Sequence, residues 1–266
     1  MADSTDTRKE RRATARAERD RAEAAQARRR QRLWILGGVL ALAVVVVVVI
    51  ALAASGGNDT PAKKAGEILP GQIETNARFA GIPQRGIVVG KPNAPVTLVE
   101  FADLQCPFCR NYTTTVLPSI VDRYVRTGKL RMEFRNVSFI GNDSLRAAQM
   151  AGAAGLQNKL WQYIDLFYTN QGEENSNYVT DEFLTRLGRA VRGLDVQKAM
   201  NDRALPSIQR ALTEAQTEWT TAGFNGTPAF LLGPTGGRLS AMLGSQVAPT
   251  VDNVSQSIDA ALQQAR

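Results

Sequence analysis

Residues 96–112, VTLVEFADLQCPFCRNY, decide the fold of this 266-residue chain and hold both of its cysteines. The run VTLVEF is mostly apolar and β-branched apart from Glu100, and turn-forming residues flank it, which is typical of a buried strand. Cys106 follows after a short turn, and Pro107 stands where helices favour proline. The segment therefore predicts a strand that leads into a helix, with Cys106 and Cys109 at the junction.

The sequence that follows predicts a βαβ unit. Residues 109–128 carry apolar side chains at helical spacing, and we expect Pro118 to kink this helix. Residues 129–137, KLRMEFRNV, alternate between apolar and polar side chains and are typical of a second strand. A strand, a helix and a strand in this order favour a parallel pair with a right-handed connection.

The rest of the chain predicts a helical block, a hairpin and a last helix. Residues 143–220 contain several amphipathic segments that indicate helices. Residues 228–233 and 237–244 are two short strand patterns joined by PTGG, which is a hairpin signal. Residues 248–265 return to helical spacing. Together these elements predict one α/β domain over residues 87–266.

Three kinds of site could use two cysteines separated by two residues. A disulfide staple would close a loop of only four residues, which stabilises a fold by roughly 2 kcal/mol. A structural zinc site needs four ligands, and this chain offers two sulfurs and no histidine, so we expect no metal ion. A redox centre fits the strand–helix junction better than either alternative.

The redox interpretation depends on the N-terminus of the helix. Its unpaired N–H groups and positive dipole end stabilise a thiolate. A cysteine with a pKa near 8.5 is about 3% thiolate at pH 7, whereas a pKa of about 6 gives roughly 90%. We therefore expect Cys106 to exchange with substrates. Cys109 lies most of a turn deeper, so we expect it to be more buried and to resolve the mixed disulfide.

Composition excludes several other classes of function. The chain contains no histidine, which rules out Cys–His and Ser–His–Asp catalysis. The net charge of +7 is concentrated in residues 1–32, which hold 11 Lys and Arg against 6 Asp and Glu, while the remaining residues hold 21 against 19. A nearly neutral body argues against a nucleic-acid partner.

The N-terminal part of the chain predicts a membrane anchor. Residues 33–53 contain no charge and would span roughly 32 Å as a helix, which is enough for a bilayer core. A cleaved signal peptide is the alternative, but its apolar part is usually only about 7–15 residues long. Arginines precede this run and no Lys or Arg follows it until Lys63, so we expect the N-terminus in the cytoplasm and the body outside. This predicts a basic tail over 1–32, a transmembrane helix over 33–54 and a linker over 55–86.

The segment VTLVEFADLQCPFCRNY resembles the active-site segment of the DsbA-like thiol-disulfide oxidoreductases, within the thioredoxin-fold superfamily. The resemblance runs from about residue 87 to the C-terminus and includes GIVVGKPNAPVTLVEF, KLWQYIDLFYTNQ and GFNGTPAFLLG. It implies a thioredoxin-like α/β fold with a helical insertion, preceded here by the single transmembrane helix. It also implies a cis bond between Thr227 and Pro228, beside the cysteines.

The resemblance also implies a substrate-binding surface. The backbone of Thr227, before Pro228, would pair with an extended substrate peptide, and Pro107 and Phe108 would contribute to the same surface. A plain turn before a strand is the alternative for Thr227. The strongest oxidants of the family carry a histidine between the cysteines, where this chain has Phe108.

Glu100 is the third catalytic candidate. The family's buried acid lies at this offset, close to the resolving cysteine, where burial would raise its pKa and let it relay a proton to or from Cys109. The alternative is a glutamate at the strand end that pairs with Lys129 or Arg131. Asp103 is nearer to the cysteines in sequence, but its position in a turn favours exposure or helix capping.

These features predict a membrane-anchored, extracytoplasmic thiol-disulfide oxidoreductase, with the oxidation of protein thiols as the favoured direction. A reductase or isomerase with the same site is one alternative, and a non-catalytic thioredoxin-like binding module is the other. We expect protein thiols and disulfides as substrates, a membrane redox partner, contact with the lipid bilayer through the transmembrane helix, no cofactor, and a monomer.

Overall fold

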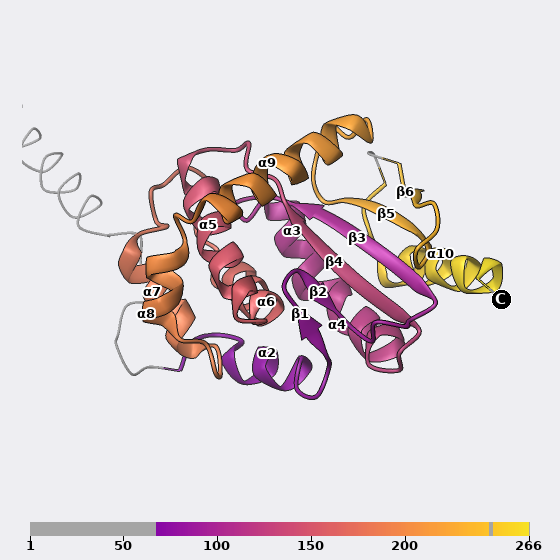
Figure 1. Ribbon diagram of the computed structural model, residues 1–266, viewed down its shortest axis with the longest axis horizontal. Helices are drawn as coiled ribbons and strands as arrows, with labels where there is room; N and C mark the ends of the chain where they lie inside the picture. Colours follow the sequence, from indigo (N-terminus) through magenta and orange to yellow (C-terminus); the bar gives the residue numbers. More distant parts are fainter. Residues whose placement is uncertain (1–67, 245–246, 266) are drawn as a thin grey trace, which may run out of the picture. The chain divides into compact units, whose positions relative to one another are not determined.

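The computed structural model describes residues 68–244 and 247–265 of the chain (Figure 1). All of these residues belong to one compact unit of the chain. The predicted tail, the predicted transmembrane helix and residues 55–67 of the predicted linker therefore lie outside the described residues. Within the described ranges, no helix has the length and apolar character needed to cross a membrane.

A six-stranded sheet forms the centre of the described unit, in the order β1-β2-β4-β3-β5-β6 (Figure 1). β3 and β4 are parallel, and the other neighbouring strands are antiparallel. The predicted parallel unit and the predicted C-terminal hairpin are both confirmed. The strands are β1 (Gln84–Arg85), β2 (Val88–Val89), β3 (Val96–Ala102), β4 (Leu130–Asn136), β5 (Ala229–Pro234) and β6 (Ser240–Met242).

β3 lies in the middle of the sheet, and all of its residues are buried. It pairs with β4 along one edge and with β5 along the other. A strand that is covered on both faces needs a continuous apolar run, which the sequence VTLVEF supplies apart from Glu100. In β4 the buried and half-buried residues alternate, as the sequence predicted.

The helical segment after β3 is not uniform. It begins with α3 (Pro107–Asn111), directly after Cys106 as predicted, and continues through a π-helical turn into α4 (Leu117–Ile120). A second π-helical turn, Val121–Val125, ends the segment. Pro118 lies in the first turn of α4 and has no N–H to offer the preceding turn, and the wider π-helical turn before it accommodates the missing bond.

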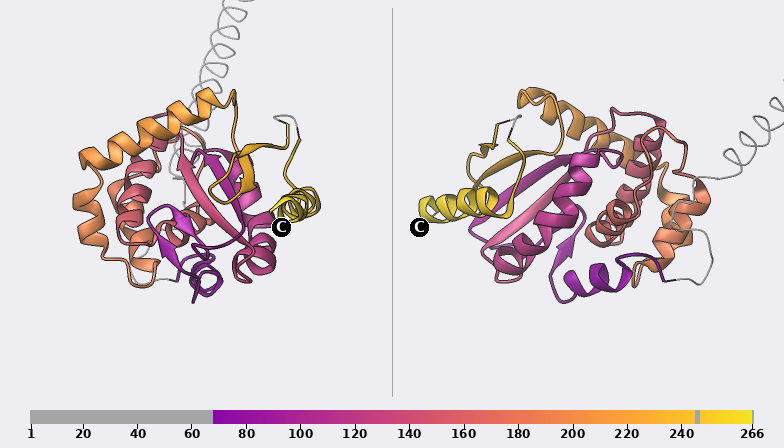
Figure 2. Two further views of the ribbon diagram at one scale, coloured as in Figure 1. Left: turned by 45° about the vertical axis from the view of Figure 1, so that its right-hand side comes forward. Right: turned by 180° about the vertical axis from the view of Figure 1, so that it is seen from behind.

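Helices cover both faces of the sheet (Figure 2). α3, α4 and α10 lie on one face, while α9 crosses the other face and contacts β4. α6 is buried along nearly its whole length and contacts α3, so the helical insertion reaches the cysteines. The helices after β4 are α5 (Asn142–Leu156), α6 (Leu160–Thr169), α7 (Asp181–Ala190), α8 (Val196–Asp202), α9 (Pro206–Thr221) and α10 (Val251–Gln264).

The described end of the predicted linker, residues 68–86, is folded against the domain. It contains α2 (Gln72–Arg78) and β1, and Phe79 is buried in the main hydrophobic core. Arg78 forms an ion pair with Asp165, which is buried on α6. The sequence does not predict this helix, because its seven residues are too few to show a clear period among the surrounding turn residues.

Candidate active site

The two cysteines lie at the N-terminus of α3, directly after the turn that follows β3. Cys106 is the N-cap residue and Pro107 occupies the first turn of the helix, as the sequence predicted. The Cys106 Sγ atom accepts a hydrogen bond from the Cys109 N–H at 3.4 Å. Both side chains are free thiols and both are buried, Cys106 at 4% and Cys109 at 0% exposure. Cys109 is therefore the deeper of the two, as predicted.

The environment shifts the two thiol pKa values in opposite directions. Hydrogen bonding to Cys109 lowers the pKa of Cys106 to about 6 against the opposing effect of burial, with help from Thr227 and from the backbone of Phe108. Burial raises the pKa of Cys109 well above its ordinary value, and the neighbouring Cys106 sulfur adds to this rise. At pH 7 Cys106 is therefore mostly thiolate, while Cys109 keeps its proton.

The loop before β5 lies against Cys106. The peptide bond between Thr227 and Pro228 is cis. In its protonated form the Cys106 thiol can donate a hydrogen bond to the Thr227 carbonyl oxygen, which lies 3.3 Å from Sγ although the two residues are 121 positions apart in the chain. β5 begins immediately after this loop and pairs with β3, so the sheet itself holds the loop beside the cysteines.

Glu100 is 1% exposed and lies in the sheet between Phe134 of β4 and Phe230 of β5. Neither of its carboxyl oxygens has a hydrogen-bond partner within the described residues. Burial raises the pKa of Glu100 to about 8, so the carboxyl is mostly protonated at pH 7. The alternative of an ion pair with Lys129 or Arg131 is wrong, because Arg131 bonds to other side chains of the sheet and Glu100 has no partner in the described ranges.

Asp103 is completely buried and is not the N-cap of α3, which is Cys106, so the expectation of exposure or helix capping is wrong. Its carboxylate accepts hydrogen bonds from the N–H groups of Gln105, Phe139 and Ile140 at 2.8, 3.0 and 3.1 Å. Three such bonds stabilise a carboxylate away from water. They also fasten the turn before Cys106 to the loop that follows β4.

The exposed side of the site is formed by the two residues between the cysteines. Phe108 is 72% exposed, and Pro107 is exposed beside it. Pro228 is half-buried. The structure thus brings the predicted residues together around Cys106, with Phe108 outside and Thr227 opposite.

Two buried glutamines beside the cysteines were missed by the sequence analysis. Gln105 and Gln171 both bond across the turn that precedes Cys106. No motif marks them, since glutamine is common in loops and turns. What marks these two glutamines is that their polar side chains are buried, and this can be seen only in the folded structure.

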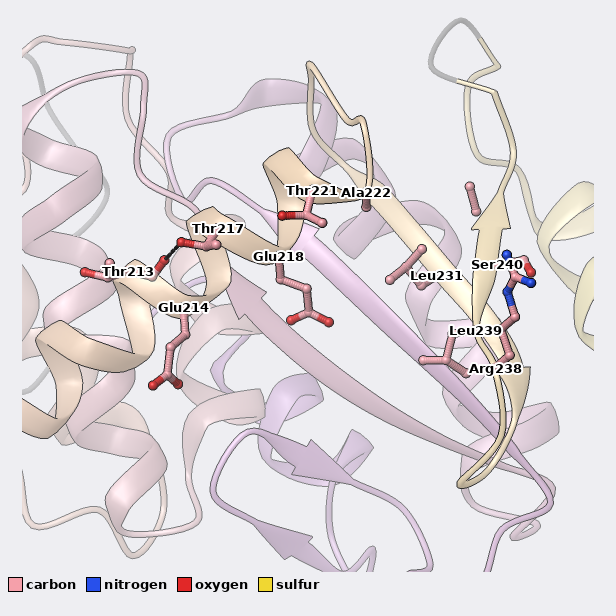
Figure 3. A pocket seen from close by; sticks show the side chains of 11 residues that line it. Thr213, Glu214, Thr217, Glu218, Thr221, Ala222, Leu231, Arg238, Leu239 and Ser240 are labelled. Carbon is pink, nitrogen blue, oxygen red and sulfur yellow. Dashed lines mark hydrogen bonds between the residues drawn. The ribbon is translucent and has the colours of Figure 1, made fainter.

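An open groove of about 820 Å³ lies between α9 and the β5–β6 hairpin (Figure 3). Threonine and glutamate side chains of α9 form one wall, and Leu231, Arg238 and Leu239 lie on the hairpin side. None of the predicted site residues lines this groove. Among the residues that the structure describes, no three metal-ligating side chains come together.

Comparison with known proteins agrees with this arrangement. A family model described as Thioredoxin matches residues 83–238. A probable disulfide bond formation protein D from Bacillus cereus is 28% identical over 187 residues, which cover 69% of this chain and 81% of the relative. The chain belongs to the thioredoxin family, among the DsbA-like thiol-disulfide oxidoreductases.

Solved structures of DsbA-like proteins share the fold. BdbD from Bacillus subtilis, in its oxidised form, has a TM-score of 0.58 at 20% identity, over 68% of this chain and 97% of that one. DsbA from Chlamydia trachomatis has a TM-score of 0.57 at 20% identity, over 68% of this chain and 92% of that one. The predicted thioredoxin-like α/β fold with a helical insertion is confirmed.

The low pKa of Cys106 predicts how fast the reduced protein is alkylated as pH changes. Because the thiolate is the reactive form, the rate with iodoacetamide should rise with pH through a midpoint near 6 and level off above pH 7. Mass spectrometry of the alkylated peptide measures the rate at Cys106 separately from Cys109. A midpoint near 8.5 would contradict the stabilisation of the thiolate by the helix end.

The unpaired Glu100 predicts a pH-dependent cost to stability. Its raised pKa means that the unfolded chain ionises near pH 4.5 while the folded chain resists ionisation up to about pH 8, so the wild type loses stability as pH rises through this window. The Glu100→Gln variant cannot ionise. Between pH 4 and pH 8, the difference in free energy of unfolding should shift in its favour by on the order of 4 kcal/mol. Urea denaturation at both pH values measures this, and parallel pH profiles would rule it out.

Proposed function

We propose that this protein is a membrane-anchored, extracytoplasmic oxidase of protein thiols that works through Cys106 and Cys109. The observation that carries the proposal is the placement of Cys106. Its sulfur lies at a helix N-terminus, with a pKa lowered to about 6, and faces the Thr227 carbonyl of the cis-proline loop. Such a cysteine loses its proton readily, and its thiolate is a good leaving group from a disulfide.

The exchange proceeds in two steps from the disulfide form of the site. A substrate thiolate attacks Cys106 Sγ, the Cys106–Cys109 bond breaks, and Cys109 leaves with the electron pair. A second substrate thiolate then attacks the substrate sulfur of the mixed disulfide, and Cys106 leaves as a stabilised thiolate. The substrate gains a disulfide and loses two electrons, which the two cysteines retain.

Glu100 serves the first step as a proton source for Cys109. A departing Cys109 thiolate is strongly disfavoured, because burial raises the pKa of this thiol. The carboxyl of Glu100, protonated at pH 7, interacts electrostatically with Cys109 and supplies a proton from inside the sheet. A raised carboxyl pKa close to the working pH suits this transfer.

Substrate binding is proposed at the loop opposite Cys106. An extended peptide that pairs with the backbone of Thr227 would present its cysteine to Cys106 Sγ, since these two groups are already within 3.3 Å of each other. Phe108 and Pro107 border this position on the exposed side, and Pro228 completes it. The substrate is therefore a thiol or disulfide in an unfolded or flexible protein segment.

Oxidation is the favoured direction because a stable Cys106 thiolate makes the reduced form of the site favourable. The lower the pKa of this thiol, the more readily the site accepts electrons from a substrate. Phe108 is neither charged nor a histidine, so the thiolate is stabilised first by the hydrogen bond with the Cys109 side chain, and then by Thr227 and the backbone of the helix end. A reductase or isomerase would use the same residues with electrons moving the other way.

The membrane anchor rests on residues 33–54, which lie outside the described residues. Their uncharged run and the arginines before it support a single-pass helix with the catalytic domain on the outer side. The proposed arrangement divides the chain into a tail over 1–32, the anchor, a linker, and the catalytic domain. A membrane protein that re-oxidises the two cysteines is the partner that this cycle needs.

The two cysteines should respond differently to replacement by serine. With a reduced, unfolded protein that has one native disulfide as substrate, Cys106→Ser should abolish disulfide formation, because no sulfur remains to form the mixed disulfide. In Cys109→Ser, the Cys106 thiolate should instead attack a disulfide substrate and release one substrate thiolate, so that a covalent mixed disulfide accumulates and is visible on a non-reducing gel. Turnover by the Cys106→Ser variant would sink the proposal and favour a non-catalytic binding module.

A further inference from the structure

The end of α6 holds the turn that precedes Cys106. The Tyr168 hydroxyl donates a hydrogen bond to the Asp103 carbonyl oxygen at 3.0 Å. Two positions after α6 ends, the side-chain amide of Gln171 donates to the carbonyl oxygens of Leu104 and Cys106, at 2.7 and 3.2 Å. Three backbone carbonyls of the active-site turn are therefore bonded to one short stretch of the insertion.

The remaining residue of the turn is bonded through its own side chain. Gln105 is 1% exposed; its amide oxygen accepts from the Asn175 N–H at 2.7 Å, and its amide nitrogen donates to Ser144 Oγ at 3.0 Å. Each residue of the turn from Asp103 to Cys106 thus has a hydrogen bond to the helical insertion. The insertion therefore holds the active-site turn in place by hydrogen bonds, in addition to packing on the sheet.

Gln171 differs from the other residues that hold the turn because its side chain donates a hydrogen bond to the carbonyl oxygen of Cys106 itself. Cys106 has an extended backbone, with φ −68° and ψ 121°, and its carbonyl also accepts the first helical bond, from the Arg110 N–H at 3.1 Å. The direction of this carbonyl fixes the Cys106 backbone, and with it the position of Sγ over the Cys109 N–H. The two amide protons of Gln171 also partly neutralise the negative charge of the Leu104 and Cys106 carbonyl oxygens, which would otherwise disfavour a thiolate nearby.

We propose that Gln171 is a positioning residue that sets the thiolate reactivity of Cys106 by holding the carbonyl of that cysteine. The inference rests on the proposed function, in which Cys106 is the exchanging thiol. Without the amide donor, two buried carbonyls lose a partner, and the turn relaxes away from the geometry in which Sγ meets the helix N–H groups. The thiolate then loses stabilisation, while Cys109 and the fold remain.

The charged and titratable groups around Cys106 stay the same when Gln171 is replaced by an uncharged residue. They are Cys109 and Arg110 on α3, Glu100 on β3, Asp103 in the turn and Tyr168 on α6. A shift in the reactivity of Cys106 would therefore report the lost amide contact rather than an altered charge.

Gln157 provides a matched control for Gln171. Its side-chain amide also makes two hydrogen bonds to backbone, both to Asp195 at 2.9 Å, but at the end of α5 rather than at the active-site turn. Replacing either glutamine with methionine removes two hydrogen bonds at similar side-chain volume. Only the Gln171 variant should change the chemistry of Cys106.

The experiment measures iodoacetamide alkylation of Cys106 in the reduced full-length protein from pH 4.5 to 9.5. For Gln171→Met we expect a midpoint shifted upward by about one pH unit, so that the rate at pH 6 falls about fivefold while the rate above pH 9 is unchanged. Gln157→Met should keep the wild-type profile, even if its melting temperature falls. A purely structural role for Gln171 would lower the melting temperature and leave the profile in place.

A Gln171→Met profile that superimposes on the wild type would overturn the inference, as would an equal shift in Gln157→Met. If Gln171→Met fails to fold, Gln171→Ala decides, because it removes the amide donor without adding charge or bulk and should also move the midpoint upward. The proposed function is judged separately. It fails if the wild type does not oxidise a protein substrate, whereas the role of Gln171 fails on the alkylation profile alone.

Discussion

The hydrogen bond from the first turn of α3 to the Cys106 sulfur is the interaction on which the rest of the site depends. It exists because β3 ends four residues before Cys106, so the sulfur arrives as the N-cap of the next helix. Helix N–H groups that have no carbonyl partner then point at the sulfur and stabilise its charge. Without this junction, a cysteine that is almost fully buried would hold its proton more firmly than a free one.

The surroundings of the two cysteines explain why the pKa of Cys106 is lowered while that of Cys109 is raised. Cys106 meets polar groups of the helix end and of the Thr227 loop, whereas Cys109, one turn deeper, meets the apolar core and the uncompensated Glu100. The same burial therefore opposes ionisation at both positions, and only at Cys106 do the hydrogen bonds outweigh it. This asymmetry separates a thiol that exchanges with substrates from a thiol that resolves.

Much of this arrangement could be predicted from the sequence because it depends on short-range patterns. The apolar run of β3, the alternation in β4 and Pro107 after Cys106 each act over a few residues, and all three match the structure. The cis bond at Pro228 came from the resemblance, since X-Pro dipeptides are usually trans in folded proteins.

The parts that could not be predicted depend on contacts between distant segments. Asp103 looked like an exposed turn residue, but the loop after β4 returns to bond to it. Gln171 has no local signal, because its partners are carbonyls 65 and 67 residues earlier in the chain. The short helix α2 is stabilised by packing against the insertion rather than by its own seven residues.

The reduction potential of the Cys106–Cys109 pair tests the central claim most directly. The purified protein is equilibrated in glutathione buffers of defined ratio, and the fraction of free thiol is read by alkylation and mass spectrometry. A stabilised Cys106 thiolate predicts a potential well above that of the glutathione couple, as a donor of disulfides requires. A potential well below that couple would contradict the account and indicate a reductase that depends on electrons delivered from elsewhere.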